Sequence, residues 1–204
     1  PSDVIGFDGR VVGYAFGREL EKTAKVNFEL DLVCDIWKDR PALSPSRIYS
    51  LPESVTGESA ESKLERVRSS MRQQGADYHL ITSLEDIAWL LNLRGRDVEN
   101  TPVFFSFALI NADCARLYVM DKSFEGADDW EVLPYFQIFK DIKKLPAGSI
   151  LLDEGIVSYA LIKSLPEDVK IINSSNPAEL MKSLKNDTEL AATENAHLKD
   201  GAAM

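Results

Sequence analysis

The stretch SLEDIAWLLNLRGRDVENTPVFF, residues 83–105, predicts a short enclosed helix followed by a polar loop and a strand. Ser83 stands where it caps the helix Leu84–Leu91, and Asp86 follows three residues later, as in a capping box. Apolar side chains occupy most of the helix surface, at Ile87, Trp89, Leu90 and Leu91. We therefore expect other elements of the fold to enclose this helix.

On both sides of this stretch, short β-rich runs alternate with amphipathic helical segments, which is the pattern of an α/β domain. Upstream, residues 60–74 predict a helix with a left-handed C-terminal cap at Gly75. The other expected strands are 78–82, 103–110, 116–120, 150–152 and 169–172, and the other expected helices are 133–144, 157–164 and one that begins at Asn176-Pro177. Residues 47–173 therefore form one predicted α/β unit.

The first forty residues predict a strand, a helix and a second strand. Val4–Phe7 and Arg10–Val12 flank the turn pair Asp8-Gly9, as in a β-hairpin. Residues 15–25 are rich in helix formers, and residues 30–37 are again apolar. We expect this segment either to pack loosely on the rest of the chain or to pair with a neighbouring chain through an open strand edge.

Residues 41–57 contain three prolines and predict a linker between domains. At the other end, residues 187–204 predict the beginning of a long helix without a C-terminal cap. The chain also starts without a methionine and without the pattern of a signal peptide. We therefore expect a piece of a larger protein.

The composition is that of an acidic globular protein, with 33 acidic against 23 basic side chains and a net charge of −10. Such a surface repels phosphate backbones, so no nucleic-acid partner is expected. The densest basic stretch has the spacing of a solvated helix face, with Lys63, Arg66, Arg68 and Arg72. No apolar run reaches the 18 residues that indicate a membrane span, so no membrane interaction is expected.

Two cysteines, Cys34 and Cys114, lie far apart in apolar contexts. They form neither a paired-cysteine metal motif nor a disulfide framework. We expect both to be small buried side chains in a protein of a reducing compartment, which fits a cytoplasmic location.

Four stretches carry a resemblance to a known family: DLVCDIWKDRP (31–41), SLEDIAWLLNLRGRDVENTPVFFSFALI (83–110), NPAELMKSLKND (176–187) and ATENAHLKDGAAM (192–204). In this order they resemble the three-domain aminopeptidase P enzymes of the creatinase/prolidase superfamily, which hydrolyse the bond between an N-terminal residue and a following proline. The most specific part is D-x-A-W-L-x-N-x-R-G-x-D-V-x-x-x-P-V-F, which begins at Asp86. The resemblance covers nearly the whole chain.

The resemblance implies an α/β fold with a mixed sheet of the ribonuclease-H-like type found in creatinase/prolidase N-terminal domains. Residues 1–43 then correspond to the tail of the N-terminal domain and residues 44–175 to the middle domain. Residues 176–204 correspond to the start of a catalytic domain that the chain does not complete. Many members of the family are dimers, so the resemblance also implies a possible homodimer.

For the full-length parent, the resemblance implies two Mn²⁺ ions held by two Asp, two Glu and one His of the catalytic domain, which activate a water molecule. The chain ends before these ligands, so we expect no catalytic residue, metal site or cofactor in this fragment, and no activity of the fragment alone. His79 lies in a strand-like context and predicts a satisfied, partly buried imidazole. His197, three residues from both Glu194 and Asp200, offers too few donors for Mn²⁺.

The loop that follows the enclosed helix holds Gly95 between Arg94 and Arg96, where it permits a tight turn. Two guanidinium groups beside exposed backbone N–H groups are able to bind an anion or a carboxylate. The simpler alternative is that Arg94 or Arg96 pairs with Asp97 or Glu99 and only fixes the turn, and the residues alone favour this alternative.

The resemblance changes that balance, because the corresponding loop in this superfamily faces the catalytic cleft and helps to limit the length of the substrate. It implies that Arg94, Arg96, Asp97 and Asn100 shape a cleft for proline-containing peptides without taking part in the chemistry. The leading hypothesis is therefore the non-catalytic portion of an Xaa-Pro aminopeptidase, which also contributes subunit contacts.

Two other functions stay open from the sequence. One is a stand-alone protein-binding module of a non-catalytic relative, for which the acidic net charge suits a basic partner. The other is a nuclease of the ribonuclease-H type, whose only candidate carboxylate pair, Asp153-Glu154, is better explained by solvated turn residues. A peptide-stacking surface is also conceivable, but its aromatic residues have the spacing of core positions: Trp89, Phe104, Phe105 and Phe107.

Overall fold

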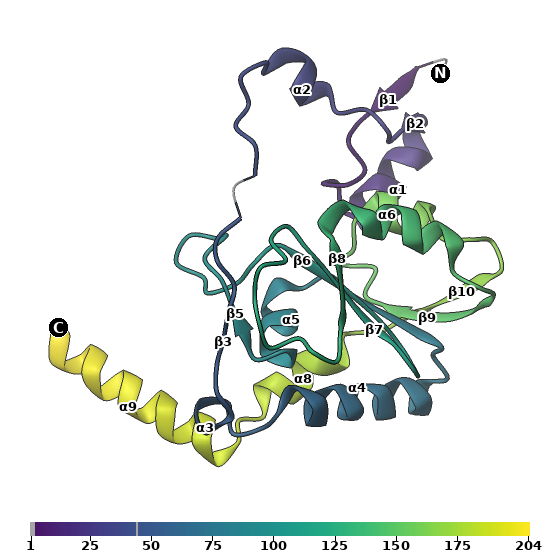
Figure 1. Cartoon of the computed structure of the whole chain (residues 1–204). Helices are drawn as coiled ribbons and strands as arrows, with labels where there is room; N and C mark the ends of the chain where they lie inside the picture. Colours follow the sequence, from purple (N-terminus) through teal and green to yellow (C-terminus); the bar gives the residue numbers. More distant parts are fainter. Residues whose placement is uncertain (1–2, 44) are drawn as a thin grey trace.

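A six-stranded mixed sheet forms the centre of the computed structural model, which describes residues 3–43 and 45–204 (Figure 1). In spatial order its strands are β10 (Val169–Asn173), β9 (Gly148–Leu152), β4 (Tyr78–Ile81), β6 (Ser106–Asn111), β7 (Ala115–Val119) and β8 (Glu131–Pro134). Strands β10, β9 and β4 run parallel to one another, β6 is antiparallel to both β4 and β7, and β8 is parallel to β7. The expectation of an α/β fold with a mixed sheet is confirmed.

Alternating residues of the strands face two hydrophobic cores, one on each side of the sheet. In β4, for example, Ile81 faces the first core and Leu80 faces the second. The first core is covered by α4 (Ala60–Gln74), α5 (Leu84–Leu90) and α8 (Pro177–Ser183). The second is covered by α6 (Ile138–Asp141), its flanking 3-10 turns η1 (Tyr135–Gln137) and η2 (Ile142–Lys144), and α7 (Tyr159–Lys163).

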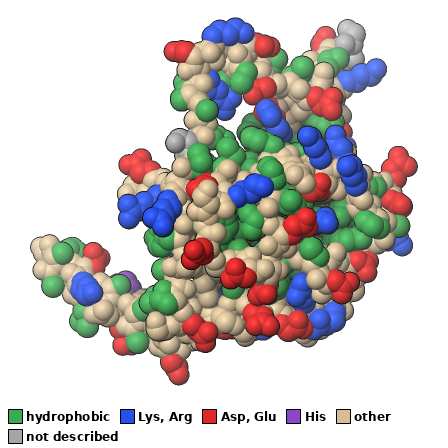
Figure 2. Space-filling view, viewed as in Figure 1, with side chains coloured by type: hydrophobic (Ala, Val, Ile, Leu, Met, Phe, Trp, Pro, Cys, Tyr) green, Lys and Arg blue, Asp and Glu red, His purple; other side chains and the backbone are tan. Residues whose placement is uncertain are grey.

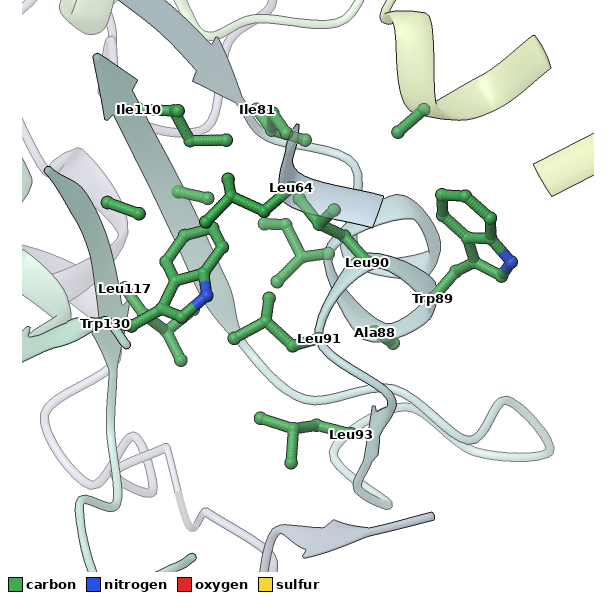
Figure 3. Close-up of a cluster of buried hydrophobic side chains, with 14 of the residues drawn as sticks. Leu64, Ile81, Ala88, Trp89, Leu90, Leu91, Leu93, Ile110, Leu117 and Trp130 are labelled. Carbon is green, nitrogen blue, oxygen red and sulfur yellow. The ribbon is translucent and has the colours of Figure 1, made fainter. Parts of the chain in front are cut away.

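Local capping signals set the ends of the two helices around the first core. Gly75 ends α4 in the left-handed region, with φ of 69°. The Ser83 hydroxyl caps α5 by accepting the N–H of Asp86 at 3.3 Å. Asp86 does not complete the predicted capping box, because its carboxylate binds Asn176 and Lys182 instead. The helix is enclosed as expected (Figure 3), with Ile87, Trp89, Leu90 and Leu91 all buried.

Two element boundaries differ from the sequence-based expectation. The predicted helix at 133–144 begins only at Tyr135, because Glu131–Pro134 pairs with β7 as an edge strand. The predicted strand at 103–110 begins only at Ser106, since the Phe105 N–H binds the side chain of Asp97 and not a neighbouring strand.

The N-terminal segment is a small βαβ unit and not the predicted hairpin. Strands β1 (Val4–Gly6) and β2 (Lys25–Asn27) pair in parallel, and α1 (Tyr14–Thr23) connects them. Residues 10–12 form no strand, because the N–H groups of Val11 and Val12 both bind the Asp8 carbonyl in a tight turn.

The apolar run at 30–37 is also not a strand but contains helix α2 (Leu32–Ile36). Asp31 caps this helix by accepting the N–H of Cys34, which leaves Cys34 exposed. The prediction that both cysteines are buried is therefore wrong for Cys34, while Cys114 is only partly exposed. The cap explains the error, because it turns a run of apolar residues away from a sheet and into solvent.

The predicted linker at 41–57 contains two short elements. Strand β3 (Tyr49–Ser50) pairs with β5 (Leu93–Arg94), and α3 (Glu53–Thr56) follows it. The proposed domain boundary at residue 44 lies outside the described residues. At the C-terminus, α9 (Asp187–Ala203) contacts α3 with its first turns and then extends away from the sheet (Figure 1). None of the described helices is both long enough and apolar enough to cross a membrane.

Candidate functional site

A pocket of about 360 Å³ lies where the predicted cleft loop meets the C-terminal helices. Residues of α5, of the loop, of α8 and of α9 form its walls, including Trp89, Arg94, Val103, Lys182, Glu189 and Thr193. Of the four residues predicted to shape a cleft, Arg94 lines this pocket. The other three lie on the loop around it.

Arg94 is a half-buried cation held by backbone carbonyl groups. Its Nη1 group donates to the carbonyl oxygens of Ala88 at 2.8 Å and Leu93 at 2.9 Å. Burial lowers the pKa of the Arg94 guanidinium. Tyr49 and Glu189 raise this pKa, but by less than burial lowers it. The side chain therefore faces the pocket as a fixed positive charge that is only partly compensated.

Asp97 fixes the shape of the loop through backbone groups. Its carboxylate accepts the N–H of Ser46 and, at 2.8 Å, the N–H of Phe105, while its own N–H binds the Val103 carbonyl at 3.1 Å. Among the described residues, neither Arg94 nor Arg96 forms an ion pair with an acid of the same loop, which was the simpler alternative.

Arg96 and Asn100 lie on the outer side of the loop and are exposed. The backbone N–H of Arg96 donates to the Ser46 hydroxyl at 2.6 Å, so Arg96 helps to fix the loop through its main chain. Asn100 occupies the left-handed region with φ of 59°, a conformation that asparagine tolerates better than most residues. The structure thus places these two residues at the turn and not in the pocket.

Lys63 is buried, so the prediction that it lies on the solvated face of a helix is wrong. Its side chain is only 1% exposed, and its Nζ atom binds the Asn92 Oδ1 atom at 2.6 Å and the Trp89 carbonyl at 3.0 Å. Burial lowers the pKa of Lys63 to about 8. The helix spacing contained the signal, because Lys63 lies four residues before Val67 and eight before Met71 on the inner face of α4.

His79 is fully buried and each ring nitrogen faces an oxygen atom, so a neutral imidazole donates to only one of them. The prediction of a satisfied, partly buried imidazole is therefore only partly met. The ring nitrogens of His79 lie 3.0 Å from the Leu151 carbonyl and 2.9 Å from Asn176 Oδ1. Asn176 Nδ2 then donates to Asp86 at 2.8 Å, and the Lys182 ammonium lies 2.7 Å from the same carboxylate. Burial lowers the pKa of His79. This chain of side chains joins the sheet and α5 to α8.

The described residues offer no site for the two metal ions that the resemblance implies. Within residues 3–43 and 45–204, no group of three or more His, Cys, Asp or Glu side chains could hold a metal ion. His197 lies exposed on α9. Asp153, the nuclease candidate, uses its carboxylate to accept the N–H of Gly155 within its own turn. The implied metals therefore do not fit these residues.

Two of the four aromatic candidates for a stacking surface are core residues, as expected. Phe104 is fully buried and Trp89 is almost so. Phe105 and Phe107 are partly buried, and both rings contact Tyr135, Phe105 edge-on and Phe107 in a tilted arrangement. On the face shown in Figure 2, acidic and basic side chains are interspersed.

Comparison with known proteins gives one matching family and a set of related enzymes. Residues 39–189 match the model of the Creatinase/Prolidase N-terminal domain. A probable Xaa-Pro aminopeptidase P from Fusarium vanettenii is 31% identical over 98% of this chain and 37% of its own length. A protein of the same description from Aspergillus niger is 34% identical over 98% of this chain and 36% of its own length. The chain thus spans about a third of the length of these curated relatives.

One solved structure resembles nearly the whole chain. It is the crystal structure of an X-prolyl aminopeptidase from Caenorhabditis elegans, described as a cytosolic enzyme with a di-nuclear active site. The TM-score is 0.88 over 99% of this chain and 36% of that chain, at 24% sequence identity. At this identity the likeness establishes the fold alone.

Proposed function

Because the chain belongs to the family of creatinase/prolidase N-terminal domains, we propose that it is the non-catalytic portion of an Xaa-Pro aminopeptidase. Such an enzyme removes the N-terminal residue that precedes a proline. In this proposal the loop Asn92–Asn100 forms part of the wall of the substrate cleft, and proline-containing peptides are the substrates of the longer enzyme. The similarity to probable Xaa-Pro aminopeptidases over 98% of the chain supports the proposal.

The position of Arg94 carries the assignment of the cleft wall. Arg94 lines the pocket together with residues of α5, of the segment Thr101–Val103 and of helices α8 and α9. Two backbone carbonyls fix Nη1, so the rest of the planar fork is held in a defined direction. A fixed guanidinium is suited to bind a carboxylate or a peptide carbonyl.

The remaining parts of the proposal concern the longer enzyme. Its two metal ions, taken to be Mn²⁺, would be held by residues beyond those described here, where they would activate a water molecule. Residues 1–43 would close an N-terminal domain, residues 44–175 would form the middle domain, and residues 176–204 would lead into the catalytic domain. The enzyme would be cytoplasmic and would form a homodimer.

The test is the steady-state kinetics of Arg94→Ala in the longer enzyme with short Xaa-Pro peptides. Loss of one charge-assisted contact should raise KM at least about tenfold and leave kcat nearly unchanged. Arg96→Ala is the matched control, because that side chain is exposed on the same loop and should leave KM unchanged. An unchanged KM for Arg94→Ala would overturn the assignment of the loop to the cleft wall.

A further inference from the structure

Trp89 lies between a side chain of α9 and a side chain of α4. Its indole Nε1–H group donates to Glu189 Oε1 at 3.2 Å, and its ring lies 4.3 Å from the Lys63 Nζ atom. Figure 3 shows that the indole points away from Leu91 and Trp130, on the opposite side of α5. Trp89 therefore does not only fill the core but also contacts both charged groups.

The Glu189 carboxylate is held in place by the first turn of α9. Its Oε2 atom accepts the N–H of Asn186 at 3.1 Å, and the Glu189 N–H binds the Asn186 side chain, which completes a capping box. Asn186 in turn donates to the Thr56 carbonyl at 2.8 Å. The position of the first turn of α9 therefore determines where Glu189 contacts the indole.

Lys63 connects the other side of Trp89 to the predicted cleft loop. An ammonium group has three N–H donors. Here two of them donate to the Trp89 carbonyl and Asn92 Oδ1, and the third faces the Trp89 ring. Asn92 is the first residue of the loop and has a φ of 55°, in the left-handed region. Its Nδ2 atom also donates to the Glu58 carbonyl at 2.8 Å. Lys63 thereby fixes the residue from which the loop starts.

We propose that Lys63 and Trp89 are positioning residues that couple the start of α9 to the loop Asn92–Asn100. A displacement of Glu189 moves the indole, the ring moves the Lys63 ammonium, and the ammonium moves Asn92. The functional role of this coupling rests on the proposed function of the loop. If the loop forms the cleft wall, a movement of α9 adjusts that wall. The contacts themselves do not depend on that function.

The contact between Glu189 and Trp89 also brings a negative charge near the buried Lys63 cation. Glu189 and Glu58 both counteract the lowering of the Lys63 pKa by burial. Glu189→Gln keeps the size of the side chain and an oxygen that accepts the indole N–H. It removes the negative charge, so it should lower the pKa of Lys63 further below about 8. This titration reports the electrostatic contact between Glu189 and Lys63, whereas the signals of Asn92 and Gly95 report the coupling to the loop.

The experiment is NMR spectroscopy of the isolated 204-residue chain as wild type and as Glu189→Gln. We expect shifts of the Trp89 indole signal, the Asn92 side-chain amide signal and the Gly95 backbone signal, together with a lowered Lys63 titration. The matched control is Glu194→Gln, one to two turns further along α9 and exposed, which should change only signals of α9. If Glu189→Gln changes the signal of Trp89 but not the signals of Asn92 and Gly95, the proposed coupling is overturned.

A second variant tests the same coupling from Lys63. In Lys63→Arg the charge is retained, so Asn92 and Trp89 should still respond to Glu189→Gln; in Lys63→Met the response should stop at Trp89. A response at Asn92 that survives in Lys63→Met contradicts the assigned path. These measurements need no peptide, so their failure is distinguishable from the failure of the kinetic test on Arg94.

Discussion

The ring of Tyr159 lies directly against the backbone of Gly17, so close that a β-carbon at Gly17 would come within 2.1 Å of Tyr159 Cδ2. The fully buried ring also packs edge-on against Phe7 and Phe28. Beside these contacts, the Tyr159 N–H binds the Val12 carbonyl at 2.8 Å. The N-terminal segment is therefore anchored on α7 by specific packing, in contrast to the expected loose attachment.

Gly17→Ala should weaken this anchor, because the added methyl group cannot be accommodated without moving the aromatic ring. We expect the free energy of unfolding to fall by about 1–3 kcal/mol and hydrogen exchange in α1 to accelerate. Gly13→Ala is the control, since a β-carbon there meets no atom within 4 Å. Equal exchange rates in α1 for Gly17→Ala and wild type would show that the N-terminal segment is held by other contacts.

Lys63 should make the stability of the chain depend on pH in the alkaline range. Burial lowers the pKa of Lys63 from 10.5 to about 8, so the unfolded chain binds this proton more tightly than the folded chain. The free energy of unfolding should therefore rise between pH 8 and pH 10.5 relative to the variant Lys63→Met, which lacks the titration. Chemical denaturation across this range measures the difference.

The exposed Lys199 on α9 provides the control for this titration. Comparison of wild type with Lys199→Met across the same pH range gives the effect of removing an exposed lysine. If the difference between wild type and Lys63→Met is constant, Lys63 is not desolvated in the folded chain.

Asn176→Ala should release α8 from the sheet. The substitution removes the N-cap of α8, and His79 and Asp86 each lose one buried hydrogen-bond partner. We expect the free energy of unfolding to fall by about 2–4 kcal/mol. Thermal unfolding measures this loss beside Asn195→Ala, a substitution in the exposed part of α9 that should cost much less. Equal losses for the two variants would mean that the buried chain of side chains contributes little.

The fold was largely predictable where local signals and periodicity agree. The caps at Ser83 and Gly75 and the enclosed apolar surface of α5 are local features, and the structure confirms them. The family resemblance carried by the string that begins at Asp86 is confirmed by the match of residues 39–189. The hairpin at residues 4–12 was wrong and the helix at 133–144 was predicted to begin two residues too early, because strand pairing between distant segments decides both.

The candidate site was predictable only in part. The four loop residues follow from one continuous string, but the contact between Trp89 and Glu189 joins residues 100 positions apart. Lys63 was missed because its basic neighbours made the whole stretch look solvated, although its spacing from Val67 placed it on the buried face. The charge of Lys63 predicts an exposed side chain, whereas its helical position predicts a buried one. It is buried because three uncharged groups at the end of α5 contact the ammonium.

We propose that this chain contributes a wall, and not the catalytic centre, of an Xaa-Pro aminopeptidase. The most direct test is release of the N-terminal residue from a short Xaa-Pro peptide by the purified 204-residue chain with added Mn²⁺. We expect no release above that of Mn²⁺ in buffer. Release that grows in proportion to the amount of chain, co-elutes with it and stops on addition of a chelator would show that this chain is itself catalytic.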